Sequence, residues 1–215
     1  MKPRVKICCI SSIEEAQLAI RYGASALGLV SAMPSGPGPI SEELIAEIAA
    51  VIPPGVASFL LTSKQDAESI IVQQRRCRTN TLQLVDRISV PSYHTLRKEL
   101  PGIALVQVVH VTGEESIIEA LTVSEFVDAI LLDSGNQLLP VKELGGTGRT
   151  HDWELSKRIV ESVKIPVYLA GGLKAENVAD AIKQVQPFGV DLCSGIRTNG
   201  RLDEQKLAAF FAQVQ

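Results

Sequence analysis

The chain has few aromatic residues and no long apolar segment. Only 4% of its 215 residues are Phe, Trp or Tyr, whereas 46% are hydrophobic. A core of this composition must be aliphatic, which is typical of Val, Ile and Leu packed in layers around a parallel sheet. No apolar run is long enough to span a bilayer, and the start of the chain lacks the apolar stretch of a signal peptide. We therefore expect a cytoplasmic protein.

The chain also lacks an excess of positive charge. Its formal net charge of −3 at pH 7 provides no general attraction for nucleic acids or anionic membranes, and we expect neither as a partner. The four cysteines do not form the C-x-x-C pairs of zinc and redox sites, since Cys8 and Cys9 are adjacent and Cys77 and Cys193 are isolated. We expect free thiols and no bound metal or cofactor.

What the sequence does contain is a regular alternation of apolar runs and amphipathic stretches. The chain contains eight apolar runs of strand length, and each is followed by a segment with apolar residues at helical spacing. This alternation indicates a parallel sheet with helical crossovers, and eight repeats predict an α/β fold closed into a single (β/α)8 TIM barrel over residues 1–215. The predicted strands are 5–9, 25–30, 56–61, 81–84, 103–109, 127–132, 166–169 and 188–191, and the predicted helices are 13–22, 42–51, 65–76, 91–99, 114–121, 153–162, 175–184 and 203–212.

An open, doubly wound sheet is the alternative fold. Such sheets usually have fewer strands and a glycine fingerprint after the first strand, where this chain reads C-C-I-S-S at residues 8–12. In a barrel, function resides in the loops that follow the strands. The loops at residues 31–40 and 134–150 are much the longest, as expected of loops that cover a substrate, although an exposed spacer explains residues 35–39 equally well.

A carboxylate and a thiol occupy the ends of two predicted strands. Asp133 ends the sixth strand directly before a Gly-rich loop, and Cys8 lies near the end of the first. If they face each other across the barrel mouth, they can act as general acid and general base. Lys6 shares the Cys8 side of its strand and supplies a cation that favours a thiolate. The alternative for Cys8 is an inert core residue, which is the role we expect of Cys9 on the helix-facing side.

Glycines follow each of the last three strands. The loops contain G-G-T-G at residues 145–148, G-G at 171–172 and S-G at 194–195. Unobstructed backbone N–H groups can surround an anionic oxygen, and in barrels the loops after strands seven and eight commonly hold a phosphate. Tight turns and helix caps are the alternative explanation, but three adjacent loops of this kind favour phosphate binding.

Seven stretches match one known enzyme family in order and spacing. They are V-K-I-C at residues 5–8, G-A-S-A-L-G-L-V at 23–30, L-Q-L at 82–84, L-L-D at 131–133, G-G-T-G-R-T-H-D-W at 145–153, A-G-G-L-K-A-E-N-V at 170–178 and P-F-G-V-D-L-C-S-G at 187–195. With them the chain resembles the phosphoribosylanthranilate isomerases over essentially its whole length. The resemblance implies a TIM barrel that converts N-(5-phosphoribosyl)anthranilate to 1-(2-carboxyphenylamino)-1-deoxyribulose 5-phosphate. The implied reaction is a cofactor-free Amadori rearrangement of tryptophan biosynthesis, in a monomer or homodimer.

The resemblance also assigns roles to individual residues. Asp133 matches the general acid that protonates the furanose ring oxygen, and Cys8 matches the general base that removes the proton at C2. Asp191 matches an aspartate near the substrate. The residues implied to bind phosphate are Gly146, Thr147, Gly148, Gly171, Gly172, Ser194 and Gly195. The further predicted substrate contacts are Lys6, Gln83, His110 and Arg197.

Departures from the family pattern cluster where the anthranilate group is expected. The family carries an arginine in the loop after strand two, which binds the anthranilate carboxylate, whereas residues 35–41 read S-G-P-G-P-I-S and contain no cation. The family's Q-L-H-G reads Q-L-V-D at 83–86, and Cys9 replaces a glycine. His110 and Arg197 introduce a titratable ring and a cation, and Arg197 is a candidate carboxylate clamp. A capped strand end and a solvated surface arginine are the alternatives for these two residues.

These observations predict a phosphoribosylanthranilate isomerase and leave two alternatives. One is a related isomerase that acts on a different N-phosphoribosyl or sugar-phosphate substrate, because the anthranilate end is altered. The other is a phosphosugar-binding protein without isomerase activity. A protein that only binds its ligand has no need for Cys8 and Asp133 facing each other.

Overall fold

The computed structural model describes residues 2–135, 141–144 and 148–214. The strands are β1 (Arg4–Ile7), β2 (Ala26–Val30), β3 (Ala57–Thr62), β4 (Thr81–Leu84), β5 (Ala104–His110), β6 (Ala129–Asp133), β7 (Val167–Leu169), β8 (Gly189–Leu192), β9 (Arg197–Thr198) and β10 (Arg201–Leu202). The helices are α1 (Ile13–Arg21), α2 (Glu42–Val51), α3 (Ala67–Cys77), α4 (Val90–Glu99), α5 (Glu115–Val123), α6 (Trp153–Ser162), α7 (Val178–Val185), α8 (Glu204–Gln213) and the 3-10 turn η1 (Ser194–Ile196).

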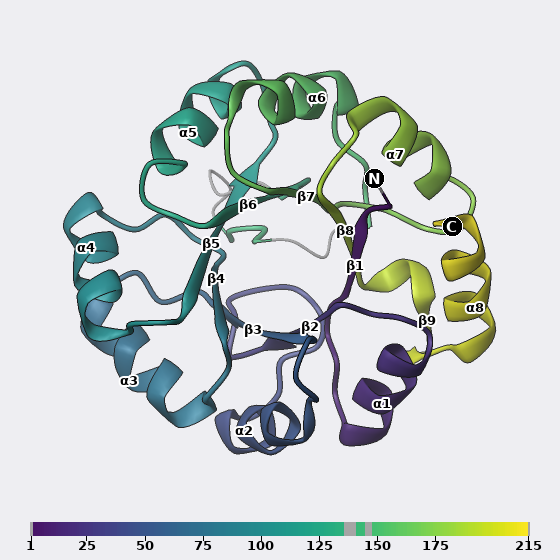
Figure 1. Ribbon diagram of the computed structural model, residues 1–215, viewed down its shortest axis with the longest axis horizontal. Helices are drawn as coiled ribbons and strands as arrows, with labels where there is room; N and C mark the ends of the chain where they lie inside the picture. Colours follow the sequence, from purple (N-terminus) through teal and green to yellow (C-terminus); the bar gives the residue numbers. More distant parts are fainter. Residues whose placement is uncertain (1, 136–140, 145–147, 215) are drawn as a thin grey trace.

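Strands β1 to β8 form one closed parallel barrel in chain order, with α1 to α8 around its outside (Figure 1). The closing pair is β8 with β1, where Lys6 lies opposite Asp191. The predicted (β/α)8 TIM barrel is therefore confirmed, and the open doubly wound sheet is excluded. The short antiparallel pair β9–β10 was not predicted; it follows η1 and precedes α8.

The core has two layers, as the strand alternation requires. The outer layer lies between strands and helices and contains residues such as Ile7, Leu27 and Leu60, each 0% exposed. The inner layer fills the barrel and is also largely aliphatic, apart from Phe59 and Tyr168, whose rings pack edge to face with centroids 6.0 Å apart. Buried polar side chains occur in both layers: Lys6 and Asp191 are paired inside the barrel, whereas Gln107 accepts a hydrogen bond from Tyr93 of α4.

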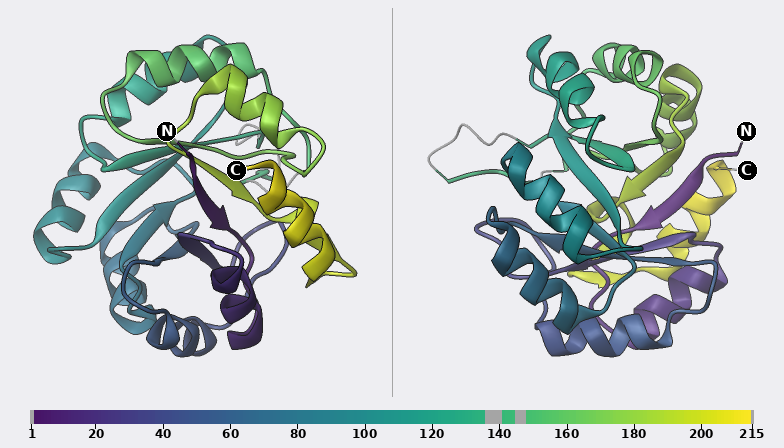
Figure 2. Two further views of the ribbon diagram at one scale, coloured as in Figure 1. Left: turned by 45° about the vertical axis from the view of Figure 1, so that its right-hand side comes forward. Right: turned by 60° about the vertical axis from the view of Figure 1, so that its left-hand side comes forward.

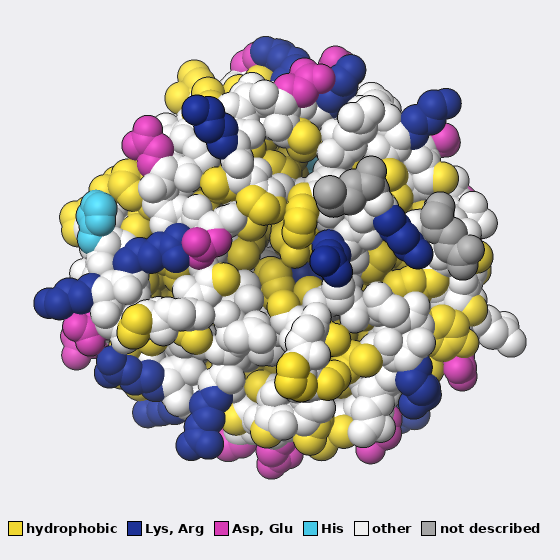
Figure 3. All heavy atoms as spheres, viewed as in Figure 1, with side chains coloured by type: hydrophobic (Ala, Val, Ile, Leu, Met, Phe, Trp, Pro, Cys, Tyr) yellow, Lys and Arg dark blue, Asp and Glu magenta, His cyan; other side chains and the backbone are white. Residues whose placement is uncertain are grey.

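The two ends of the barrel differ. Both termini lie at the end opposite the loop that contains residues 141–144 (Figure 2). The face with the termini shows hydrophobic side chains among scattered basic ones (Figure 3). A shallow depression at this end is lined by residues that start β1 and β4 or lie close to strand starts, such as Arg4, Thr81 and Tyr168. The described residues that line this depression include no carboxylate, thiol or imidazole. Among the described helices, none has the length and apolar character needed to cross a bilayer.

Candidate active site

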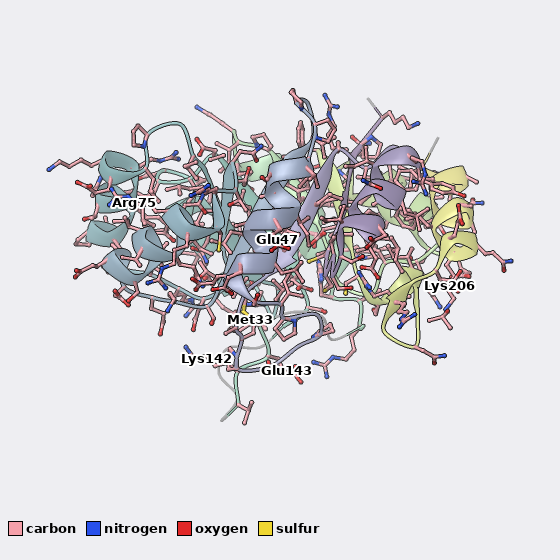
Figure 4. All side chains as sticks on the ribbon, turned by 90° about the horizontal axis from the view of Figure 1, so that it is seen from below. Met33, Glu47, Arg75, Lys142, Glu143 and Lys206 are labelled. Carbon is pink, nitrogen blue, oxygen red and sulfur yellow. The ribbon has the colours of Figure 1, made fainter. Side chains whose placement is uncertain are left out.

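A pocket opens at the other end of the barrel, where the strands finish. Its walls come from the strand ends and from the loops that follow β2, β6, β7 and β8. Met33 of the β2–α2 loop and Lys142 and Glu143 of the β6–α6 loop lie at this end, whereas Arg75 lies on the side of the barrel on α3 (Figure 4). The two longest loops predicted from the sequence thus meet over the pocket. Ser35 and Lys142 join them, because the Ser35 hydroxyl donates to the Lys142 carbonyl oxygen at 2.6 Å.

The predicted acid and base both line this pocket. Asp133 is the last residue of β6, Cys8 directly follows β1, and both are buried. The Ser134 N–H donates to Asp133 Oδ1 at 2.7 Å. Burial raises the pKa of Asp133 to about 6; the Asp191 carboxylate adds to the rise, while the Ser134 hydrogen bond and Lys6 oppose it. A carboxyl group with this pKa is half protonated near pH 6 and can donate a proton at physiological pH.

Lys6 lies inside the barrel one layer below Cys8. Its fully buried ammonium group is 2.9 Å from Oδ2 of Asp191 and 5.2 Å from the centre of the Phe59 ring. Gly28 leaves room for both side chains, because a Cβ there would lie 2.8 Å from the Cys8 Sγ and 3.0 Å from the Lys6 Nζ. Burial opposes the charge on Lys6, but Asp191 and then Cys8 outweigh it, and the pKa of Lys6 lies above its usual value. A permanent cation therefore lies beside the sulfur.

Cys9 does not face the helices, contrary to the prediction. Strand β1 ends at Ile7, and Cys9 has a left-handed backbone with φ of 61°, so its side chain belongs to the inner layer and lines the pocket together with Cys193. Its thiol lies 3.6 Å from the Pro37 carbonyl oxygen, to which it donates. Hydrogen bonding to Cys193 is the main cause that holds the pKa of Cys9 above its usual value. The replacement of glycine by Cys9 thus brings a second thiol next to the predicted base.

The backbones of the glycine loops meet at one end of the pocket. Gly172 has φ of 62°, and a Cβ on it would lie 2.7 Å from the carbonyl carbon of Arg149. A Cβ on Gly195 would lie 2.2 Å from the Leu173 carbonyl oxygen. Only glycine allows these loops to pack this closely. Of the residues predicted to bind phosphate, Gly148, Gly171, Gly172 and Ser194 line the pocket, Gly195 packs behind it, and Gly146 and Thr147 lie outside the described residues.

The end of the pocket next to β2, β3 and β4 is mainly apolar. Gln83 is its polar exception, because the side chain is 3% exposed and its Oε1 has no hydrogen-bond partner among the described residues. Such a lining accommodates an aromatic ring with one hydrogen-bonding group at its edge. Sequence reasoning proposed Gln83 as a substrate contact but proposed none of its apolar neighbours, because an apolar residue at a strand end looks like an ordinary core residue in the sequence. These neighbours are Val30, Met33, Leu61, Val85 and Leu144.

His110 is not among the residues that line the pocket, although the sequence suggested a substrate contact. Its Nε2 lies 3.3 Å from the Val85 carbonyl oxygen. Gly135 covers the other ring nitrogen, since a Cβ on Gly135 would lie 2.5 Å from His110 Nδ1. Burial lowers the pKa of His110, which keeps the ring neutral. The geometry supports the simpler alternative, a histidine that ends its strand and packs under the β6–α6 loop.

Arg197 is likewise absent from the pocket lining. Its guanidinium binds the Glu15 carboxylate with two N–H···O contacts of 3.0 Å and donates to the Gly200 carbonyl oxygen at 2.9 Å. It also donates to the carbonyl oxygens of Cys8 and Cys9. The side chain is 8% exposed, so it is neither a solvated surface arginine nor free to bind a substrate carboxylate. Arg197 instead holds the backbone that carries the predicted base.

The carboxyl, thiol and lysine groups occupy the positions expected of an acid–base enzyme. A carboxyl group with a raised pKa and a thiol beside a lysine line one pocket, next to glycine loops that can receive an anion. No group of three or more His, Cys, Asp or Glu that could hold a metal ion occurs among the described residues. Fold and site together define a (β/α)8-barrel enzyme whose pocket is suited to a phosphorylated substrate.

Comparison with known proteins shows to which family of barrel enzymes this chain belongs. The family model described as N-(5'phosphoribosyl)anthranilate (PRA) isomerase matches residues 5–213. The chain belongs to this isomerase family, which confirms the resemblance seen in the sequence.

Individual relatives support the same assignment. The chain is 37% identical to N-(5'-phosphoribosyl)anthranilate isomerase 2 of Methanosarcina mazei over 96% of this chain and 92% of the relative. It is 33% identical to the isomerase of Methanocella arvoryzae over 98% and 96% of the two chains. Among solved structures, the isomerase of Thermotoga maritima aligns with a TM-score of 0.83 at 31% identity, covering 99% and 98%. A structure in complex with reduced 1-(o-carboxyphenylamino)-1-deoxyribulose 5-phosphate aligns with a TM-score of 0.80 at 30% identity, covering 99% and 98%.

Proposed function

We propose that this protein converts N-(5'-phosphoribosyl)anthranilate to 1-(2-carboxyphenylamino)-1-deoxyribulose 5-phosphate in tryptophan biosynthesis, with Asp133 as general acid and Cys8 as general base. The observation that carries the proposal is that both side chains are buried in one pocket beside the glycine loops. The reaction moves hydrogen within one molecule, so it needs a proton donor and a proton acceptor but no external oxidant or reductant. Family membership supplies the identity of the substrate.

Asp133 begins the reaction by protonating the furanose ring oxygen. The C1–O bond then breaks and the lone pair of the anilino nitrogen forms a C=N bond, which gives an open-chain Schiff base. A carboxyl group of ordinary pKa is almost fully ionised at neutral pH, but the pKa of Asp133 is about 6, which leaves a useful protonated fraction. Its burial thus has a direct catalytic consequence.

Cys8 continues the reaction by removing the proton at C2. The electrons of the C2–H bond form a C1=C2 bond, the C=N electrons return to nitrogen, and the resulting enolamine tautomerises to the ketone. The Lys6 ammonium lies beside the sulfur, because a Cβ on Gly28 would contact both groups. Asp191 anchors Lys6 in this position and faces the same pocket.

The glycine loops are proposed to bind the phosphate of the substrate. Gly148, Gly171, Gly172 and Ser194 line one end of the pocket, and the sequence adds Gly146, Thr147 and Gly195 to the proposed set. The anthranilate ring then lies at the apolar end near Gln83. A small phosphorylated substrate is thus the proposed partner, while a cytoplasmic location, a monomer or homodimer and a single domain over residues 1–215 stay predictions. Four unpaired cysteines support a reducing compartment.

A related isomerase acting on a different N-phosphoribosyl compound is the second candidate. The observation that favours it is that the described residues lining the apolar end include no lysine or arginine for a substrate carboxylate. A binding protein without activity is disfavoured, because binding alone does not require a carboxyl group of raised pKa opposite a thiol.

Turnover of freshly prepared N-(5'-phosphoribosyl)anthranilate, followed by the change in anthranilate fluorescence, tests the proposal. We expect turnover by the wild type and a loss of about 100-fold or more in kcat for Asp133→Asn. The matched control is Asp180→Asn on α7, away from the pocket. Absence of wild-type turnover, with phosphate still stabilising the protein, favours the different substrate. Near-normal turnover by Asp133→Asn overturns the assignment of the acid.

A further inference from the structure

The proposed substrate carries a carboxylate on its aromatic ring, and this group needs a cationic partner when it leaves water. The phosphate end of the pocket cannot supply it, because the sugar separates the two anions. The described lining at the apolar end contains no lysine or arginine. The partner must therefore come from just outside this lining.

Lys142 is placed to be that partner. It precedes Leu144 by two residues, and its backbone carbonyl accepts the hydroxyl of Ser35; both of these neighbours line the pocket. Its ammonium group binds the carboxylate of Asp86, the residue that follows Val85 of the pocket lining. Lys142 is thus linked to three residues of the pocket lining: to Leu144 along the chain, to Ser35 by a hydrogen bond, and to Val85 through its neighbour Asp86. Figure 4 shows Lys142 at the mouth of the barrel.

Asp86 explains why a lysine is needed here. Its side chain is 6% exposed, and one oxygen accepts the Arg87 N–H at 2.8 Å while the other binds Lys142. A buried carboxylate at this end would repel the carboxylate of a substrate. Lys142 neutralises Asp86 and, with its side chain 38% exposed, keeps further N–H donors accessible to a second carboxylate.

The other cations near the pocket are ion-paired with other carboxylates. Lys6 is paired with Asp191 inside the barrel. Arg197 is paired with Glu15 on the outer side of Cys8 and Cys9. Arg149 packs its backbone against Gly172 in the glycine loops, and its guanidinium is paired with Glu143.

We infer that Lys142, held in place by Asp86, binds the ring carboxylate of the substrate and so selects for an ortho-carboxylated aromatic group. This inference rests on the proposed function and names the residue that gives the pocket its specificity. The β2–α2 loop, which has no cation over residues 35–41, contributes Ser35 to fix the Lys142 backbone instead of supplying a charge.

Calorimetric binding of two stable ligands tests the inference. One is reduced 1-(2-carboxyphenylamino)-1-deoxyribulose 5-phosphate, and the other is the same molecule without the carboxyl group. We expect wild type to prefer the carboxylated ligand by about tenfold or more, the usual magnitude for a charge-assisted hydrogen bond. Lys142→Met removes that preference without weakening binding of the other ligand by more than about twofold, and Lys142→Arg restores most of it. Lys183→Met, an exposed lysine on α7, is the matched control.

Two additional variants separate a specific contact from local disruption. Asp86→Asn keeps the cation, so it retains the preference for the carboxylated ligand. Lys142→Met/Asp86→Asn leaves no uncompensated carboxylate, and it still loses the preference. If Lys142→Met weakens both ligands equally, or neither, the inference is wrong while the proposed function stands. If wild type binds neither ligand, the proposed function itself fails.

Discussion

The ammonium group of Lys6 lies 2.9 Å from the carboxylate of Asp191, and both side chains are enclosed in the barrel. The pair joins β1 to β8, the two strands that close the barrel, at the register position where Lys6 and Asp191 face each other. Burial of two charges has a large desolvation cost, so the pair is weak evidence for stability. Its position beside Cys8 and Asp133 agrees with the catalytic roles that we propose for those two residues.

Removal of one member of this pair is expected to destabilise the protein. Lys6→Met leaves Asp191 buried without a counter-ion, so we expect a loss of about 3 kcal/mol in the free energy of unfolding. Lys6→Met/Asp191→Leu removes both charges and recovers most of that loss, although it is inactive. Urea denaturation of both variants measures the difference. Equal stability of Lys6→Met and wild type would contradict a charged pair.

Asp133→Asn is expected to stabilise the protein in a pH-dependent way. The pKa of Asp133 is about 6 in the folded state, above the usual 3.8, so folded protein binds more protons between these values and loses stability as the pH rises through this window. The destabilisation is absent below about pH 4 and complete above about pH 6. The neutral asparagine avoids it, which predicts a gain of about 3 kcal/mol at pH 7.5 and none at pH 4. Urea denaturation at both values checks this; a gain that is the same at both pH values refutes the raised pKa.

Arg197 is expected to act as a positioning residue and not as a substrate contact. Arg197→Met removes the ion pair with Glu15 and the donors to the carbonyls of Cys8 and Cys9, so we expect a loss of about 3 kcal/mol in stability. Because the proposed base Cys8 is displaced while the rest of the pocket lining is kept, kcat should fall more than KM rises. Glu15→Gln should show part of the same effect, and the two changes should not be additive. A large rise in KM at unchanged kcat would instead indicate a direct carboxylate clamp.

Cys9 provides a test of backbone strain. At φ of 61° any side chain with a Cβ is disfavoured, whereas glycine is not. Cys9→Gly and Cys9→Ala both remove the sulfur, so they differ only in the Cβ and in the backbone conformations that it allows. We expect Cys9→Gly to be more stable than Cys9→Ala by about 1 kcal/mol, the reverse of the usual order. Thermal or urea denaturation of the two variants measures this difference in stability. A more stable alanine variant would contradict the left-handed backbone of Cys9.

The barrel itself could be predicted because strand–helix alternation is a local property of the sequence. The location of Asp133, Gly148, Gly171 and Gly172 at the pocket could be predicted, because these residues end strands or form loops at recognisable positions. Ser12, Ser41 and Asp152 also begin their helices with the side-chain caps that their types favour. Each of these signals acts over a few residues.

The remaining features depend on contacts between distant segments. The direction of the Cys9 side chain follows from a left-handed backbone just after β1, which strand alternation does not anticipate. Arg197 is paired with Glu15, which is far away in the sequence. The burial of Arg197 therefore could not be predicted from the residues next to it in the chain. The pairing of Lys142 with Asp86 likewise joins two loops that are far apart in the sequence.

The most direct test of the account removes three of the four thiols of the chain one at a time. Turnover of N-(5'-phosphoribosyl)anthranilate would be measured for Cys8→Ala, Cys193→Ser and Cys77→Ala, of which the last removes a buried thiol on α3 outside the pocket. The account predicts that Cys8→Ala loses about 100-fold or more in kcat with its fold intact, while the other two stay within about tenfold of wild type. Near-normal turnover by Cys8→Ala, or an equal loss in Cys193→Ser, would show that Cys8 is not the base.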